Sequence, residues 1–81
     1  MAQYVATFFS HYDAITFAQN LAAKGIAAKP MPVPRRVSSS CGTGVRFETD
    51  QDVALLKQDG LDKVYRCDAD AYALVLENRQ D

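Results

Sequence analysis

The stretch YVATFFSHYDA, residues 4–14, decides the fold, because it runs from a strand directly into the start of a helix. The residues before Ser10 are mostly β-branched or aromatic, which is typical of a strand. Ser10 then supplies a helix N-cap, and Asp13, three positions on, completes a variant of the capping box. Apolar residues recur at helical spacing after this cap until Gly25 ends the helix. The stretch therefore predicts a strand followed by a helix.

The rest of the chain predicts three further strands, over residues 26–33, 44–49 and 61–67. The first of these carries prolines that cannot donate to a ladder, so it should lie at a sheet edge. Between the last two, Thr49-Asp50-Gln51-Asp52 repeats the cap signature, and Gly60 closes a short second helix.

The predicted order is thus strand, helix, strand, strand, helix, strand. It indicates an α+β ferredoxin-like βαββαβ sandwich over residues 1–67, with two helices on one face of a four-stranded antiparallel sheet. Residues 68–81 form a C-terminal extension. Apolar side chains in this extension recur at the spacing of one helix face, which favours a helix, and a last strand over residues 72–76 is the alternative.

Composition excludes several classes of function. The chain has 81 residues, enough for one domain, with nine basic and ten acidic side chains. Because nothing in so balanced a set resembles the broad basic face that phosphate-backbone binding needs, nucleic acid is not expected as the main partner. No apolar run is long enough to span a membrane, and the N-terminus lacks the pattern of a signal peptide. A cytoplasmic protein with reduced cysteines is therefore expected.

One segment, PVPRRVSSSCGTGVRF at residues 32–47, departs from this ordinary pattern. It surrounds Cys41 with basic, hydroxyl and glycine residues: Arg35, Arg36, Ser38, Ser39, Ser40, Gly42 and Gly44. In the predicted fold, the loop that holds Cys41 lies at the end of the sheet where the first helix begins, near Ser10 and His11. A helix N-terminus and nearby arginines stabilise a thiolate, and they lower a cysteine pKa below its free value of about 8.5. The segment therefore predicts an activated thiol in an anion-binding loop.

Simpler explanations exist for each of these residues. Cys41 can be incidental, His11 can be a surface residue of the first helical turn, and Arg35 and Arg36 can protect a sheet edge. The second cysteine, Cys67, is predicted at the opposite edge of the sheet, beyond disulfide reach of Cys41, and is expected to be structural. With a single histidine, the chain offers no zinc-binding set, and no metal or organic cofactor is expected.

These residues also carry a family resemblance. The chain resembles, over residues 4–67, a small bacterial family of unknown function described as putative selenium/sulfur carrier protein-like. The most specific part is the proline-arginine-serine-cysteine-glycine core, formed here by Pro32, Pro34, Arg35, Val37, Ser38, Ser39, Cys41 and Gly42. The end of the first strand, with Ser10, His11, Asp13 and Ala14, matches as well. The tail from residue 68 onward departs from the family pattern.

The resemblance implies a carrier rather than a turnover enzyme. Relatives look like the C-terminal part of proteins whose other half resembles a sulfur-relay carrier, which implies that Cys41 holds a persulfide or perselenide. Since that half is missing here, the relay partner would act in trans. The alternative is a non-catalytic module in which residues 35–44 bind an anion or small metabolite, or contact another protein. In either case an exposed sheet edge could pair two copies into a homodimer.

Overall fold

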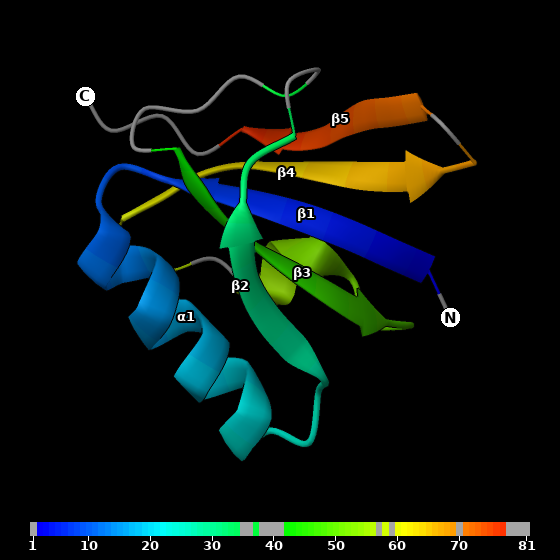
Figure 1. Ribbon diagram of the computed structural model, residues 1–81. Helices are drawn as coiled ribbons and strands as arrows, with labels where there is room; N and C mark the ends of the chain where they lie inside the picture. Colours follow the sequence, from blue (N-terminus) through cyan, green and yellow to red (C-terminus); the bar gives the residue numbers. More distant parts are fainter. Residues whose placement is uncertain are drawn as a thin grey trace.

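The computed structural model describes residues 2–34, 37, 42–56, 58, 60–69 and 71–77. These residues form five strands, one α-helix and one 3-10 turn (Figure 1). In chain order they are β1 (Ala2–Phe8), α1 (His11–Ala23), β2 (Ala28–Pro32), β3 (Thr43–Thr49), η1 (Val53–Leu56), β4 (Leu61–Asp68) and β5 (Ala71–Glu77). No helix in this described part of the chain is long and apolar enough to cross a membrane.

The strands form one sheet in the order β2-β3-β1-β4-β5, in which every neighbouring pair is antiparallel. β1 lies in the middle, between β3 and β4, although it is the first strand of the chain. Its central position explains its apolar sequence, because Val5, Ala6, Thr7 and Phe8 are all completely buried. β2, which carries Pro30 and Pro32, lies at one edge, as predicted.

The core lies between α1 and one face of the sheet (Figure 1). Phe17 projects from α1 to the centre of that face and is only 1% exposed. Its ring centroid lies 5.0 Å from that of Phe8 on β1 and 5.6 Å from that of Phe47 on β3, both tilted arrangements that aromatic pairs favour. Tyr4 stacks on Phe47 at 5.4 Å and extends the cluster toward the start of β1.

The predicted second helix is not confirmed: among the described residues between Thr49 and Gly60, the chain forms the four-residue 3-10 turn η1 and no α-helix. Val53 and Leu56 are buried, whereas Leu55 is 73% exposed. Residues three apart lie on one side of a 3-10 turn, which has three residues per turn, so Val53 and Leu56 both face the core. The cap signature is satisfied locally, because Ala54 N donates to Asp52 Oδ1 at 3.0 Å and Gln51 N donates to Thr49 Oγ1 at 3.1 Å.

The helix favoured for the tail is wrong, and the alternative, a last strand, is right: β5 pairs antiparallel with β4. A short apolar run fits both the repeat of a helix face and the alternation of a strand, so its sequence does not distinguish the two. Here the pairing with β4 decides in favour of the strand. β4 is consequently an inner strand and β5 the edge. The fold is therefore α+β with one antiparallel sheet of five strands and one helix, and the predicted four-stranded, two-helix ferredoxin-like sandwich is not confirmed.

Candidate functional site

The loop between β2 and β3 is closed at its base by a hydrogen bond from Val33 N to Gly42 O at 3.0 Å. Inside it, Val37 N donates to Pro34 O at 3.0 Å and the Val37 side chain is buried. Val33 lies over the sheet face opposite α1, since a Cβ on Gly44 would meet both Val33 Cγ2 and Val5 Cγ1. The predicted site residues Arg35, Arg36, Ser38, Ser39, Ser40 and Cys41 lie outside the described residues.

Ser10 caps α1, as the sequence predicted. Its backbone is extended (φ −144°, ψ 158°), and its hydroxyl accepts a hydrogen bond from Asp13 N at 3.2 Å. The same hydroxyl donates to Asp13 Oδ2 at 2.6 Å. A serine hydroxyl has a single proton to donate, so in this arrangement Ser10 holds the helix start together and has no second proton for a bound anion.

Asp13 brings a negative charge to the positive end of α1. Its carboxylate packs against Gly60, where an added Cβ would lie 2.2 Å from Asp13 Cγ. Gly60 also accepts a hydrogen bond from Phe9 N at 3.0 Å and adopts a left-handed φ of 89°. An acidic group in the first turn offsets the partial positive charge of a helix N-terminus. The helix dipole is thus a weaker source of anion stabilisation here than the sequence suggested.

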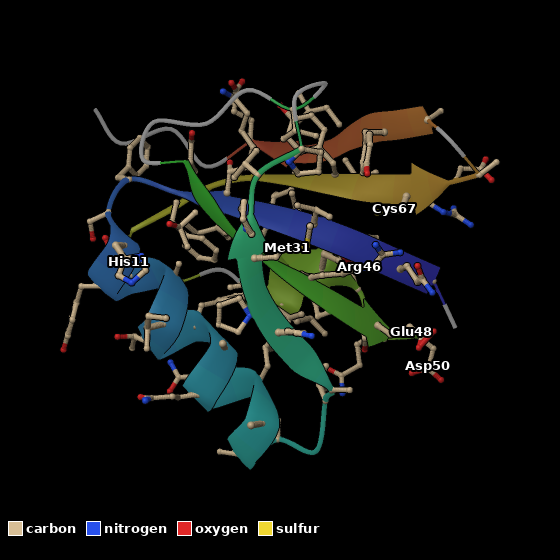
Figure 2. All side chains as sticks on the ribbon, in the orientation of Figure 1. His11, Met31, Arg46, Glu48, Asp50 and Cys67 are labelled. Atoms are coloured by element: carbon tan, nitrogen blue, oxygen red, sulfur yellow. The ribbon has the colours of Figure 1, made fainter. Side chains whose placement is uncertain are left out.

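His11, the first residue of α1, reaches the other end of the loop. Its Nδ1 lies 3.1 Å from Thr43 Oγ1, the first residue of β3, although the two are 32 positions apart. This contact confirms, for the described end of the loop, that the β2–β3 connection meets the start of the helix. His11 is exposed, and Figure 2 shows it at the opposite end of the sheet from Arg46 and Cys67.

Thr43 was not among the predicted site residues. Its only sequence signal is its place between two glycines at the end of the loop, and a contact with His11 follows only from the strand order.

Glycine is required at the two positions beside Thr43 for different structural reasons. Gly42 has a left-handed φ of 77°, and a Cβ there would meet nothing within 4 Å, so its backbone conformation requires glycine. Gly44 is buried, and its Cβ would lie 2.9 Å from the backbone oxygen of Ala6, so close approach of the strands requires glycine. Gly44 pairs with Thr7 on one side and Met31 on the other. It belongs to the sheet, and Gly42 is the glycine that borders the loop.

Cys67 lies in a different setting. It pairs with Gln3 of β1 and Tyr72 of β5, so it lies on an inner strand of the sheet. The prediction that Cys67 lies at the edge of the sheet is therefore wrong. Partial burial raises the pKa of the Cys67 thiol, and the positive charge of Arg46 opposes that shift only in part. A raised pKa keeps the thiol protonated at neutral pH and lowers its nucleophilicity, which fits the structural role expected for it.

A shallow groove of about 260 Å³ lies near Cys67's end of the sheet, lined by Gln3, Ala27, Ala28, Lys29, Arg46, Phe47 and Glu48. Arg46 is exposed and donates through Nη2 to Gln3 Oε1 at 2.5 Å. Glu48 brings a negative charge to the same groove, so its lining has no single sign. The residues that the structure describes contain no group of three or more metal-binding side chains.

A strand that leads into a capped helix, together with a cysteine-bearing loop returning to that helix start, defines a small α+β domain with its candidate site at one end of the sheet. The chain belongs to the family described as "Putative Se/S carrier protein-like", whose model matches residues 3–60. The matched span covers the elements from β1 to η1 and ends at Gly60, so β4 and β5 lie beyond it. No curated protein and no solved structure matches the chain.

Proposed function

We propose that the protein carries sulfane sulfur or selenium on Cys41 and passes it between partner proteins. Membership of the Se/S carrier-like family is the observation that carries this proposal. In the transfer, the Cys41 thiolate attacks the outer sulfur of a donor persulfide, R–S–SH. A new S–S bond forms to Cys41 while the donor's S–S bond breaks, giving Cys41–S–SH and the thiolate R–S⁻. Atoms and charge balance without an oxidant, and the reverse step delivers the sulfur to an acceptor thiol.

The contact between His11 and Thr43 supports this use of the loop. Two residues of chain span at most about 7 Å, so connectivity alone keeps Cys41 in the neighbourhood of Thr43. His11 therefore belongs to the same end of the molecule as the thiol and is the described side chain best suited to exchange a proton with it.

Asp13 makes the arginines more important to the proposal. Because its carboxylate already offsets the positive end of α1, stabilisation of a thiolate or a persulfide anion has to come mainly from formal cations. The sequence supplies Arg35 and Arg36 within six positions of Cys41. We assign them the electrostatic role, with Gly42 giving the chain the turn that the end of the loop needs.

The test measures alkylation of Cys41 as a function of pH in the Cys67→Ser variant, followed by mass spectrometry after exposure to glutathione persulfide. The carrier predicts a Cys41 pKa clearly below the free-thiol value of about 8.5 and a mass gain of one sulfur atom on Cys41. The matched control is Cys41→Ser with Cys67 intact, which should gain no sulfur. Ordinary reactivity of Cys41, or equal sulfur gain at both cysteines, contradicts the proposal.

The alternative function is an anion-binding module in which the thiol is a bystander. It is favoured by the left-handed backbone at Gly42, since turns of this kind can direct successive N–H groups toward an anion. Isothermal titration with inorganic phosphate separates the two functions. Cys41→Ser should leave phosphate binding intact and abolish sulfur carriage, whereas replacing Arg35 and Arg36 together by Ala should weaken both.

Partners follow from the same chemistry. A carrier of this kind exchanges sulfur with proteins that bear a persulfide or an acceptor thiol, and it needs a reducing compartment such as the cytoplasm to keep Cys41 available.

A homodimer through the edge of β5 is the second partner that we propose. The β2 edge carries two prolines, whereas Ala71–Leu74 of β5 carries neither proline nor charge, and Leu74 is 52% exposed. Sedimentation equilibrium should show a dimer that Ala73→Pro disrupts. A monomer at all concentrations contradicts this part of the proposal.

A further inference from the structure

The hydrogen bond between His11 and Thr43 is not needed to build either element that it joins. Ser10 already caps α1, and the ladder with β1 and β2 already holds β3. The bond connects an exposed side chain to a half-buried hydroxyl, so it contributes little to the core. Its effect is on the imidazole: one ring nitrogen is held, and the ring is fixed against the end of the β2–β3 loop.

We propose that Thr43 is a positioning residue that sets the orientation and the tautomer of His11. This inference rests on the carrier function proposed above. The 3.1 Å contact between Nδ1 and Thr43 Oγ1 is compatible with either tautomer of the ring. The relay requires the one in which Nδ1 carries the proton and donates it to Thr43 Oγ1, which leaves the lone pair on Nε2. Among the described residues Nε2 has no hydrogen-bond partner, so it is the nitrogen available to a group in the loop. The partner of one ring nitrogen determines what the other can do, and here it makes Nε2 a base.

The proton relay that this tautomer permits balances in atoms and in charge. Nε2 of His11 takes the proton from the Cys41 thiol, giving a thiolate and an imidazolium. The thiolate then displaces R–S⁻ from the donor persulfide, forming the Cys41–sulfur bond as the donor's S–S bond breaks. The imidazolium returns its proton to R–S⁻, so that neutral His11 is restored and the donor leaves as R–SH. Thr43 takes no part in the chemistry, and its role in the relay is to hold the ring.

The chain's single histidine makes the tautomer directly measurable. Long-range ¹H–¹⁵N correlation spectra of the neutral ring distinguish a proton on Nδ1 from one on Nε2. We expect the Nδ1–H form to dominate in the unmodified protein, to give way to the Nε2–H form in Thr43→Val, and to return in Thr43→Ser, which keeps the hydroxyl. A tautomer ratio that is the same with and without the hydroxyl overturns the inference.

The second measurement is the rate of Cys41 alkylation across pH, in the Cys67→Ser background. Thr43→Val should slow alkylation near neutral pH on the order of tenfold, part of what a positioned base contributes. Thr43→Ser should restore most of the rate. His11→Gln should lose at least as much as Thr43→Val, and the double variant no more than His11→Gln alone, because both changes remove the same base. Circular dichroism checks that each variant is folded.

The two measurements separate this inference from the carrier function. If Thr43→Val changes the tautomer but leaves the rate and sulfur transfer unaltered, Thr43 has no positioning role and the carrier stands. If Cys41 gains no sulfur even in the Cys67→Ser protein, the carrier fails and the relay fails with it. The tautomer measurement then still reports whether Thr43 holds the ring.

Discussion

Replacing Gly60 by alanine should destabilise the protein far more than the same change at Gly25. Both glycines adopt a left-handed backbone, with φ of 89° and 80° respectively. At Gly25 an added Cβ meets nothing within 4 Å, whereas at Gly60 it would lie 2.2 Å from Asp13 Cγ and 2.5 Å from both carboxylate oxygens. Gly25→Ala therefore measures the backbone penalty alone, and Gly60→Ala measures that penalty together with displacement of Asp13.

The size of each effect follows from these contacts. A left-handed backbone costs an alanine roughly 1–2 kcal/mol. Reduced freedom of the unfolded chain returns about 0.4–1 kcal/mol, so Gly25→Ala should cost about 1 kcal/mol. At Gly60 the displaced carboxylate also loses its bond from Ser10, and hydrogen bonds to charged groups contribute about 1.5–3 kcal/mol. Gly60→Ala should then cost roughly 2–4 kcal/mol, a large share of the stability of a domain of this size.

Urea unfolding followed by circular dichroism measures both changes, and a double-mutant cycle isolates the contact. In an Asp13→Ala background the obstructing carboxylate is absent, so Gly60→Ala should cost no more than Gly25→Ala does. Equal destabilisation by the two glycine changes in the unmodified protein would refute this account of the helix start. So would a cost at Gly60 that is unaffected by removing Asp13.

Three further outcomes are expected. Gly44→Ala should cost about 1–3 kcal/mol in urea unfolding, because its Cβ meets the immobile backbone oxygen of Ala6 at 2.9 Å; a neutral result contradicts the close approach of the strands. Phe17→Ala should cost about 3–5 kcal/mol, since the ring joins the aromatic cluster of the core, and a loss below about 1 kcal/mol would contradict that packing. Above the unfolded-state thiol pKa of about 8.5, the free energy of unfolding should fall more steeply with pH than in Cys67→Ser. The reason is that the folded-state pKa of Cys67 is raised, so the unfolded chain loses that proton first. Parallel pH profiles of the two proteins would count against it.

Local signals predicted the first half of the fold well and the second half poorly. The helix was predictable because a specific residue marks each of its ends. The Ser10 side chain caps the first turn, and Gly25 adopts the left-handed backbone that follows the last turn. The segment after Thr49 carries similar cap residues, but among its described side chains only those of Val53 and Leu56 are buried, and the cap starts a 3-10 turn there. The tail became a strand because β4 offered it a partner, which no local pattern can report.

For the described part of the candidate site, the meeting of loop end and helix start was predictable, whereas the individual hydrogen bonds around it were not. The strand order correctly brought the end of the loop to the start of α1, and His11 was identified on that ground. The Ser10 hydroxyl both accepts from Asp13 N and donates to the Asp13 carboxylate, and the second of these bonds was not predicted. The spacing of the two residues shows that a cap can form, but it does not show where the hydroxyl proton goes. Thr43 was missed for a related reason: its role depends on the side chain opposite it in space.

The central position of β1 has a consequence for the order in which the protein folds. β1 is synthesised before the other strands of the sheet, yet its residues pair with Thr49 and its neighbours on one side and with Cys67 and its neighbours on the other. α1 can form as soon as it is made, whereas β1 has no complete set of partners until nearly the whole chain exists. Contacts so distant in sequence slow folding, because long loops must close before the contacts contribute any stability. During synthesis β1 therefore waits for partners on both sides, and its two ladders can close only after β3 and β4 have been made.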